Sequence, residues 1–147
     1  MKPTGCWSAD QAERFLAESQ LPLHLASNGR SGHPLMATLW YLPLDGRLWC
    51  ATPRAARVAV RLEADPRCAF EVAEDTIPYR GVRGRAVAEL YPERGEAILR
   101  SLIDRYLDGA GSPLARWLLA RTEREVAIAL DPVSLSTWDF SARMGGA

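Results

Sequence analysis

Hydrophobic and polar positions alternate with two different periods along the chain, and each change of period marks a new element. Near the start, Ser8 and Gln11 have the spacing of a helix capping box, and apolar residues then recur every three or four positions. This pattern predicts an amphipathic helix over residues 8–19. Pro22 follows it and is incompatible with its continuation.

After the helix, apolar residues alternate with polar ones, which is the period of a strand. Two turns interrupt the alternation, the segment NGRSG and the pair Asp45–Gly46. Three strands joined by two tight turns are typical of an antiparallel meander. We expect these strands at residues 21–27, 33–42 and 48–52.

The rest of the chain returns to helical spacing three times and to strands four times. A short helix is expected after Pro53, because Ala55, Val58, Ala59 and Leu62 share one helical face. Further helices are expected from Pro92 and Ser112, and further strands at residues 68–73, 79–91, 125–130 and 133–140, the last two joined at Asp131–Pro132. About seven strands with helices outside them predict a single α+β, mainly β domain over residues 1–147, built as an antiparallel barrel.

The composition excludes several classes of partner. The 147 residues are 48% hydrophobic and 24% charged, which suits one soluble globular domain. Eighteen basic and eighteen acidic residues cancel, so nucleic acid is not expected. No apolar run reaches the ~20 residues of a membrane span, so no membrane is expected either. Three cysteines without CxxC spacing suit the reducing cytoplasm, and the two histidines stand in no metal-binding motif, so no metal is expected.

The segment ATPRAARVAV carries the clearest candidate chemistry. Arg54, Arg57 and Arg61 stand at i, i+3 and i+7, so they line one face of the expected short helix, apart from its apolar face. The free N–H groups at a helix start suit a phosphate, and the preceding Thr52 hydroxyl would complete the seat. The alternative is a solvated basic surface whose arginines pair with nearby carboxylates.

Three segments resemble the pyridoxamine 5′-phosphate oxidase-like FMN-binding split barrels: DGRLWCATPRAARVAVRLEADPRCAFEV, then PYRGVRGRAVAEL, and the terminal STWDF. The resemblance covers roughly residues 21–140. It implies an antiparallel six-to-seven-stranded split β-barrel (Greek key) with peripheral helices. It also implies a homodimer with two cofactor sites at the interface, each covered by Trp138 of the other subunit. The other cofactor-binding residues that it implies are Met36, Ala37, Thr38, Leu39, Trp40, Cys50, Thr52, Arg57 and Arg80.

The family's phosphate-binding motif is only partly present. That motif reads threonine, three residues, serine, arginine, lysine. Thr52 and Arg57 match it, whereas Ala56 and Val58 replace the serine and the lysine. The loss of a charge-assisted hydrogen bond costs ~1.5–3 kcal/mol. The other two arginines of the helix can supply the missing charge.

The predicted function is that of an FMN-dependent oxidoreductase acting on a small-molecule substrate. One alternative is a deazaflavin-dependent reductase on the same fold. Another is a non-enzymatic barrel that has lost flavin and binds haem or another small ligand. Ala56, Val58 and Gly81 favour it, because the family has a serine, a lysine and often a ring-contacting glutamine at these positions. No general base is visible, and His24 is best explained as a strand histidine. Trp40 and Tyr41 take opposite faces of one strand, so at most one of them can face a cofactor.

Overall fold

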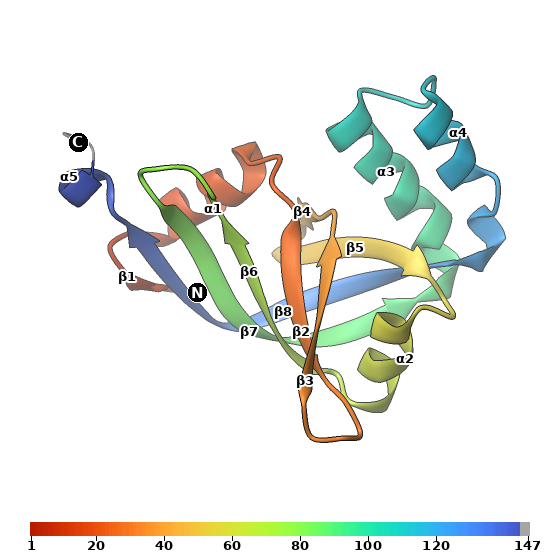
Figure 1. The fold of residues 1–147 in the computed structure, drawn as a ribbon, viewed down its shortest axis with the longest axis horizontal. Coiled ribbons are helices and arrows are strands. Elements are labelled where there is room, and N and C mark those ends of the chain that lie inside the picture. Colours follow the sequence, from red (N-terminus) through yellow and green to blue (C-terminus); the bar gives the residue numbers. More distant parts are fainter. Residues whose placement is uncertain (145–147) are drawn as a thin grey trace.

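In the computed structural model, residues 1–144 form one eight-stranded sheet with helices outside it (Figure 1). The strand order is β3–β2–β6–β7–β8–β5–β4, with β1 beside β8. Apart from β1 with β8, the pairings are antiparallel. The strands are β1 (Thr4–Gly5), β2 (Leu23–Asn28), β3 (Pro34–Leu39), β4 (Leu42–Leu44), β5 (Arg47–Pro53), β6 (Arg67–Ala73), β7 (Arg80–Tyr91) and β8 (Glu125–Asp139).

The sheet curls into a split β-barrel, as the sequence predicted. Its edge strands β3 and β4 follow each other in the chain with only Trp40 and Tyr41 between them, yet within residues 1–144 they do not pair. Alternate residues of the strands point into one apolar core. Its fully buried members on the strands include Leu23, Leu25, Val72, Val82, Ile128 and Leu130.

Helices lie at both ends of the barrel. The helical segments are α1 (Ala9–Glu18), α2 (Arg57–Ala64), η1 (Pro92–Arg94), α3 (Gly95–Leu107), α4 (Pro113–Leu119), η2 (Thr122–Arg124) and α5 (Ser141–Met144). The predicted capping box is present at α1, because Ser8 Oγ accepts from Gln11 N (3.2 Å) and Gln11 Oε1 accepts from Ser8 N (2.8 Å). Figure 1 shows α1 at one end, α3 with α4 at the other, and α2 beside the β2–β3 hairpin. None of these helices is long and apolar enough to cross a membrane.

The predicted meander is right in its two turns and wrong in its middle strand. The NGRSG turn joins β2 to β3 and the Asp45–Gly46 turn joins β4 to β5, but residues 33–42 form two strands, and β4 and β5 lie on the other side of the barrel. The chain changes sides at Tyr41, which is fully buried. Its hydroxyl donates to Leu16 O (2.7 Å), and its N–H donates to Tyr106 Oη (3.3 Å). These contacts fix the chain between α1 and α3 and end β3 before it can meet β5.

The two strands predicted at the C-terminal end form one continuous strand, β8. Its register against β7 shifts at Pro132, since Ala86 faces Pro132 and Arg85 faces Ser134, which leaves Val133 as an extra residue. Such a bulge accommodates a proline that has no N–H to donate to the ladder. β8 therefore runs for 15 residues through the sheet, between β7 and β5.

Candidate functional site

The start of α2 is the centre of the predicted phosphate seat. β5 continues to Pro53, a turn closed by Ala56 N and Pro53 O (2.9 Å) follows, and the helix begins at Arg57. Ala56 is the N-cap residue and has no side chain that could accept a hydrogen bond. The first bond within the helix joins Val60 N to Ala56 O (3.1 Å), so the amides of residues 57–59 have no acceptor inside it. Amides of this kind bind anions.

Two arginines extend this group of donors. Arg57 is the first helical residue and is exposed, while Arg61 is half-buried one turn later. The Nε of Arg61 lies 3.6 Å from the point where a Cβ on Gly29 would stand, so Arg61 reaches the β2–β3 turn. Within residues 1–144 neither arginine forms an ion pair. The cationic surface therefore runs from the start of α2 to that turn.

Arg54 does not share this surface, contrary to its predicted place on the helix. The helix starts at Arg57, three residues after Arg54, because β5 extends to Pro53 and a turn follows. Arg54 Nη2 donates to Glu123 O (3.1 Å), and its main-chain N donates to Arg124 O (2.7 Å). Arg54 thus holds η2 against the end of β5.

The carboxylate at the far end of α2 is already engaged. Asp65 accepts hydrogen bonds from Arg67 Nε (3.0 Å) and Nη2 (2.9 Å) and from Asn28 Nδ2 (3.1 Å). The bonds from Arg67 and Asn28 hold the pKa of the Asp65 carboxyl well below its usual range. Asp65 joins α2 to β2 and leaves the charge of Arg57 and Arg61 uncompensated.

β3 is the strand expected beside a flavin ring. Only some of its predicted cofactor-binding residues have side chains that a ligand could contact. Met36 and Thr38 point away from the barrel, and Met36 is 69% exposed. Ala37 and Leu39 pack against the core. Trp40 lies beyond the strand and stacks on Tyr106, with ring centres 5.0 Å apart and planes 8° apart.

Cys50 and Thr52 are alternate residues of β5 and both are buried. Cys50 is fully buried in the core, and burial raises the pKa of its thiol to about 12, so the side chain stays protonated. Cys50 as a whole is 0% exposed, so within one chain it offers no accessible surface to a cofactor, contrary to the expectation from the resemblance. Thr52 lies at the end of β5, opposite Val126 and just before the turn that leads to α2.

Trp138 lies flat against the other end of the sheet. It is paired with Gly81, and a Cβ on Gly81 would lie 2.7 Å from Trp138 Cζ2. The Arg83 guanidinium covers the ring of Trp138 at 4.3 Å, and Arg83 Nε also donates to Glu71 Oε2 (2.9 Å). The indole therefore occupies the space that a side chain at position 81 would need.

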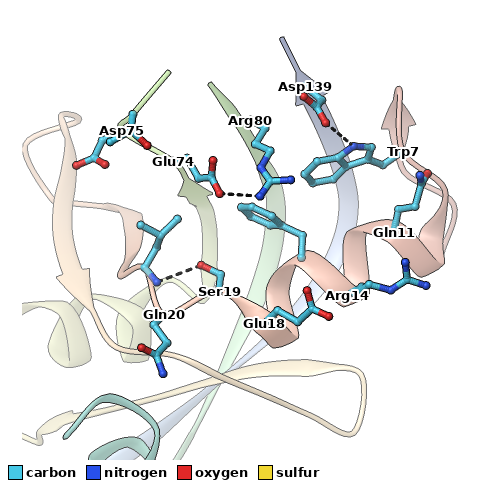
Figure 2. A pocket seen from close by; sticks show the side chains of 13 residues that line it. Trp7, Gln11, Arg14, Glu18, Ser19, Gln20, Glu74, Asp75, Arg80 and Asp139 are labelled. Atoms are coloured by element: carbon cyan, nitrogen blue, oxygen red, sulfur yellow. Dashed lines mark hydrogen bonds and ion pairs between the residues drawn. The ribbon is translucent and has the colours of Figure 1, made fainter. Parts of the chain in front are cut away.

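Arg80 lies on the opposite face of the sheet from Trp138, because successive residues of a strand alternate between faces. Figure 2 shows it in a cleft between α1 and the turn from β6 to β7. Its Nη2 pairs with Glu74 Oε1 (3.0 Å), and in the same cleft Trp7 Nε1 donates to Asp139 Oδ2 (3.2 Å). The cleft has a volume of about 610 Å³, and these paired polar groups form part of its walls.

Within one chain, the phosphate seat and Trp138 are far apart. Thr52 faces Val126 near the start of β8, whereas Gly81 faces Trp138 near its end. The extended strand between these two positions of β8 is roughly 40 Å long at ~3.3 Å per residue. One protomer therefore does not bring these two predicted site residues together.

A sequence profile of the pyridoxamine 5′-phosphate oxidase family matches residues 8–138. The chain belongs to this family. The match spans α1 and nearly all of the barrel, including the seat at α2 and Trp138. No functionally curated protein sequence matches the chain.

Solved structures of other proteins have the same fold. A conserved hypothetical protein from Mycobacterium tuberculosis is 27% identical over 91% of this chain and 86% of its own, with a TM-score of 0.77. An F420 reductase is 26% identical over 84% of this chain and 94% of its own, with a TM-score of 0.71. The heme storage protein HutZ from Vibrio cholerae, 18% identical over 86% and 91% of the two chains with a TM-score of 0.67, shares the fold.

Two groups of residues near the site were not predicted from the sequence. One is the β2–β3 turn, whose contact with Arg61 depends on how the hairpin and α2 pack. The other is a set of polar residues on the outer face of the barrel, among them Glu71 and Arg83. Period-two alternation places each of them on an outward face, but only the register of the strands shows that they are neighbours.

Proposed function

We propose that the chain is a flavin-binding oxidoreductase of the pyridoxamine 5′-phosphate oxidase family that works as a homodimer in the cytoplasm. The observation that carries this proposal is the uncapped start of α2, with Arg57 and Arg61 beside it and no ion pair to either of them among residues 1–144. Three free cysteines fit a reducing compartment.

The residues at α2 fit the phosphate of a flavin nucleotide. A family serine at position 56 could cap the helix with its own hydroxyl, whereas Ala56 leaves the amides of residues 57–59 to a ligand. Val58, in place of the family lysine, is buried in the core and cannot contribute a charge. Arg57 and Arg61 would carry that charge, and Met36 and Thr38 would lie along the ring.

A bound flavin would supply the hydride or electron transfer. The chain would contribute anion binding at α2, orientation of the ring along β3, and exclusion of water by a second subunit. Trp138 supports the dimer, because it is too far from α2 to reach the cofactor of its own chain. A two-fold symmetric partner could bring its Trp138 to the seat.

A deazaflavin is the second candidate. The likeness to an F420 reductase at 26% identity supports it, and so does the extension of the cationic surface through Arg61 to the β2–β3 turn. A cofactor with a longer anionic tail would use that extension. FMN would use mainly Arg57 and the helix amides.

The test is titration of dialysed protein with FMN, followed by flavin fluorescence. We expect a Kd in the micromolar range or tighter for the wild type. Arg57→Ala should raise the Kd tenfold to a hundredfold, because a charge-assisted hydrogen bond contributes ~1.5–3 kcal/mol. Arg54→Ala should have a smaller effect, since its guanidinium already binds Glu123 O. Arg116→Ala, on the exposed face of α4, is the matched control and should have none.

Absence of FMN binding up to about 1 mM would overturn the FMN form of the proposal. The same titration with a deazaflavin would then decide whether the seat takes that cofactor. A Soret band on addition of haem, with no binding of either flavin, would indicate the non-enzymatic barrel.

A further inference from the structure

The outer face of the barrel carries a hollow of about 480 Å³ that neither the phosphate seat nor the cleft at Arg80 includes. Two rows of outward-facing residues line it, and in each row the members are paired on neighbouring strands. One row is polar and consists of His24, Glu71, Arg83, Ser136 and Thr4, and Thr38 pairs with His24 just outside the hollow. The other row consists of Met36, Ala26, Ala69, Arg85 and Ser134.

The depth of the hollow comes from small residues in its middle. Ala26 and Ala69 are directly paired, and their side chains extend no further than a methyl group. Met36 rises on one side of them and Arg85 on the other. The result is an apolar floor of a size that suits a molecule with one or two rings.

The charges around the hollow do not cancel. Glu71 and Arg83 form an ion pair (2.9 Å) and neutralise each other. Arg85 donates from Nε to Ser134 Oγ (3.0 Å), and no carboxylate among residues 1–144 pairs with it. The hollow therefore has one uncompensated positive charge at its edge.

His24 adds a directed polar group. Its Nδ1 lies 3.2 Å from Thr38 Oγ1, which leaves Nε2 as the ring nitrogen without a partner in the described chain. When the Thr38 hydroxyl donates to Nδ1, Nε2 carries the proton and can donate to a ligand oxygen. His24 is therefore a candidate ligand-binding residue, because it lines the hollow.

We propose that this hollow binds a small aromatic carboxylate, with its ring on Ala26 and Ala69 and its carboxylate held by Arg85 and His24 Nε2. The proposal deepens the proposed function and rests on it in one respect: Met36 borders both the hollow and the expected place of the flavin ring. A carboxylate in the hollow would lie beside that ring as substrate.

The two histidines of the chain provide a direct test by NMR. The ring Cε1–H signals of His24 and His33 are followed in cofactor-free protein during titration with benzoate. We expect a saturable shift of the His24 signal only, because His33 lies in the β2–β3 turn outside the hollow. Benzyl alcohol, which has the ring but no charge, should bind at least tenfold more weakly.

Variants test the contributions of Arg85 and His24 to benzoate binding separately. Arg85→Gln should weaken benzoate binding about tenfold or more, as expected for a lost charge-assisted contact. Arg100→Gln, an exposed arginine of α3, is the control and should leave it unchanged. His24→Phe should weaken benzoate binding in calorimetry, whereas His24→Gln, which keeps a donor, should recover part of it.

Three results would overturn the proposal: no saturable shift of His24 up to about 10 mM benzoate, equal shifts of both histidines, or equal affinity for benzyl alcohol. The wild-type comparison of the two probes gives an answer even where a variant does not fold. FMN titration of the same sample keeps the two proposals apart. Benzoate binding without FMN binding would overturn only the flavin proposal. FMN binding without benzoate binding would overturn only the proposal of a carboxylate site.

Discussion

At Gly81 the main chain of β7 passes directly beneath the indole of Trp138. A methyl group there would meet three sets of atoms at once, since its carbon would lie 2.7 Å from Trp138 Cζ2, 2.7 Å from Val72 O and 2.9 Å from Ala73 Cα. Any side chain at position 81 would therefore clash with the indole of Trp138 and with the main chain of β6 at Val72 and Ala73.

Gly81→Ala should lower the free energy of unfolding by ~1–3 kcal/mol, because overpacking at a site closed by main-chain atoms cannot be relieved by a rotamer change. Urea denaturation followed by far-UV circular dichroism measures the difference. Gly111→Ala is the control, since a Cβ at Gly111 meets nothing within 4 Å, and it should be neutral or slightly stabilising. Equal stability of Gly81→Ala and the wild type would show that Trp138 does not pack against β7 as described.

The sequence predicted which residue types stand around the start of α2, but not the direction of each side chain. Val58 was explained by core packing and is indeed buried. Arg54 was placed on the helix because its spacing from Arg57 fits a helical face, but β5 and a turn occupy those positions. Spacing alone does not show where a strand stops and a helix starts.

At the scale of elements, one arginine connects the first helix to the third. Arg105 of α3 donates to the carbonyls at the end of α1, with Nη2 2.9 Å from Leu16 O and Nη1 3.1 Å from Ala17 O, and it also contacts Ser19 O. Its guanidinium lies 5.0 Å from the ring centre of Tyr41. These carbonyls have no partner within α1, so a cation there satisfies them and complements the helix dipole.

Arg105→Ala should lower the free energy of unfolding by ~2–3 kcal/mol, because charged hydrogen bonds to α1 carbonyls are lost. Arg100→Ala, one turn earlier on the same helix, removes only an exposed contact with Glu96 (3.6 Å) and should cost less than ~1 kcal/mol. Chemical denaturation of both variants measures these values. A similar loss in the two variants would mean that Arg105 does not anchor α1.

Elements with local signals were predicted well, and those that depend on distant contacts were not. The capping box located α1, and the Asp45–Gly46 pair located the β4–β5 turn, where both residues have positive φ (55° and 76°). The break between β3 and β4 and the continuity of β8 were missed, because they depend on Tyr41 reaching α1 and on a bulge at Pro132. Neither contact can be recognised from the spacing of apolar and polar residues in the sequence.

At the scale of the whole molecule, the proposed cofactor site needs two chains, and heterodimers can test this directly. A tagged Arg57→Ala chain is co-expressed with a differently tagged Trp138→Ala chain, and the heterodimer is isolated. If each site takes Arg57 from one chain and Trp138 from the other, this heterodimer has one intact site and one doubly altered site. FMN titration should then give one wild-type affinity site per dimer.

The reciprocal heterodimer is the control. It combines a wild-type chain with a chain carrying both substitutions, so a shared site is damaged at each interface and no wild-type affinity should remain. The opposite pair of results would place Arg57 and Trp138 in the same chain's site. A monomer in size-exclusion chromatography with light scattering would remove the second subunit from the proposal altogether.

The central place of β8 in the sheet has a consequence for synthesis of the protein. β8 is the last strand within residues 1–144, yet it lies between β7 and β5 and pairs with β1 near the start of the chain. A nascent chain that has not yet reached Glu125 consists of two separate pieces of sheet, β3–β2–β6–β7 and β4–β5, each with an open edge where β8 belongs. Open edges pair readily with other chains. Emergence of β8 from the ribosome is therefore the step that joins the two pieces of sheet and covers both open edges.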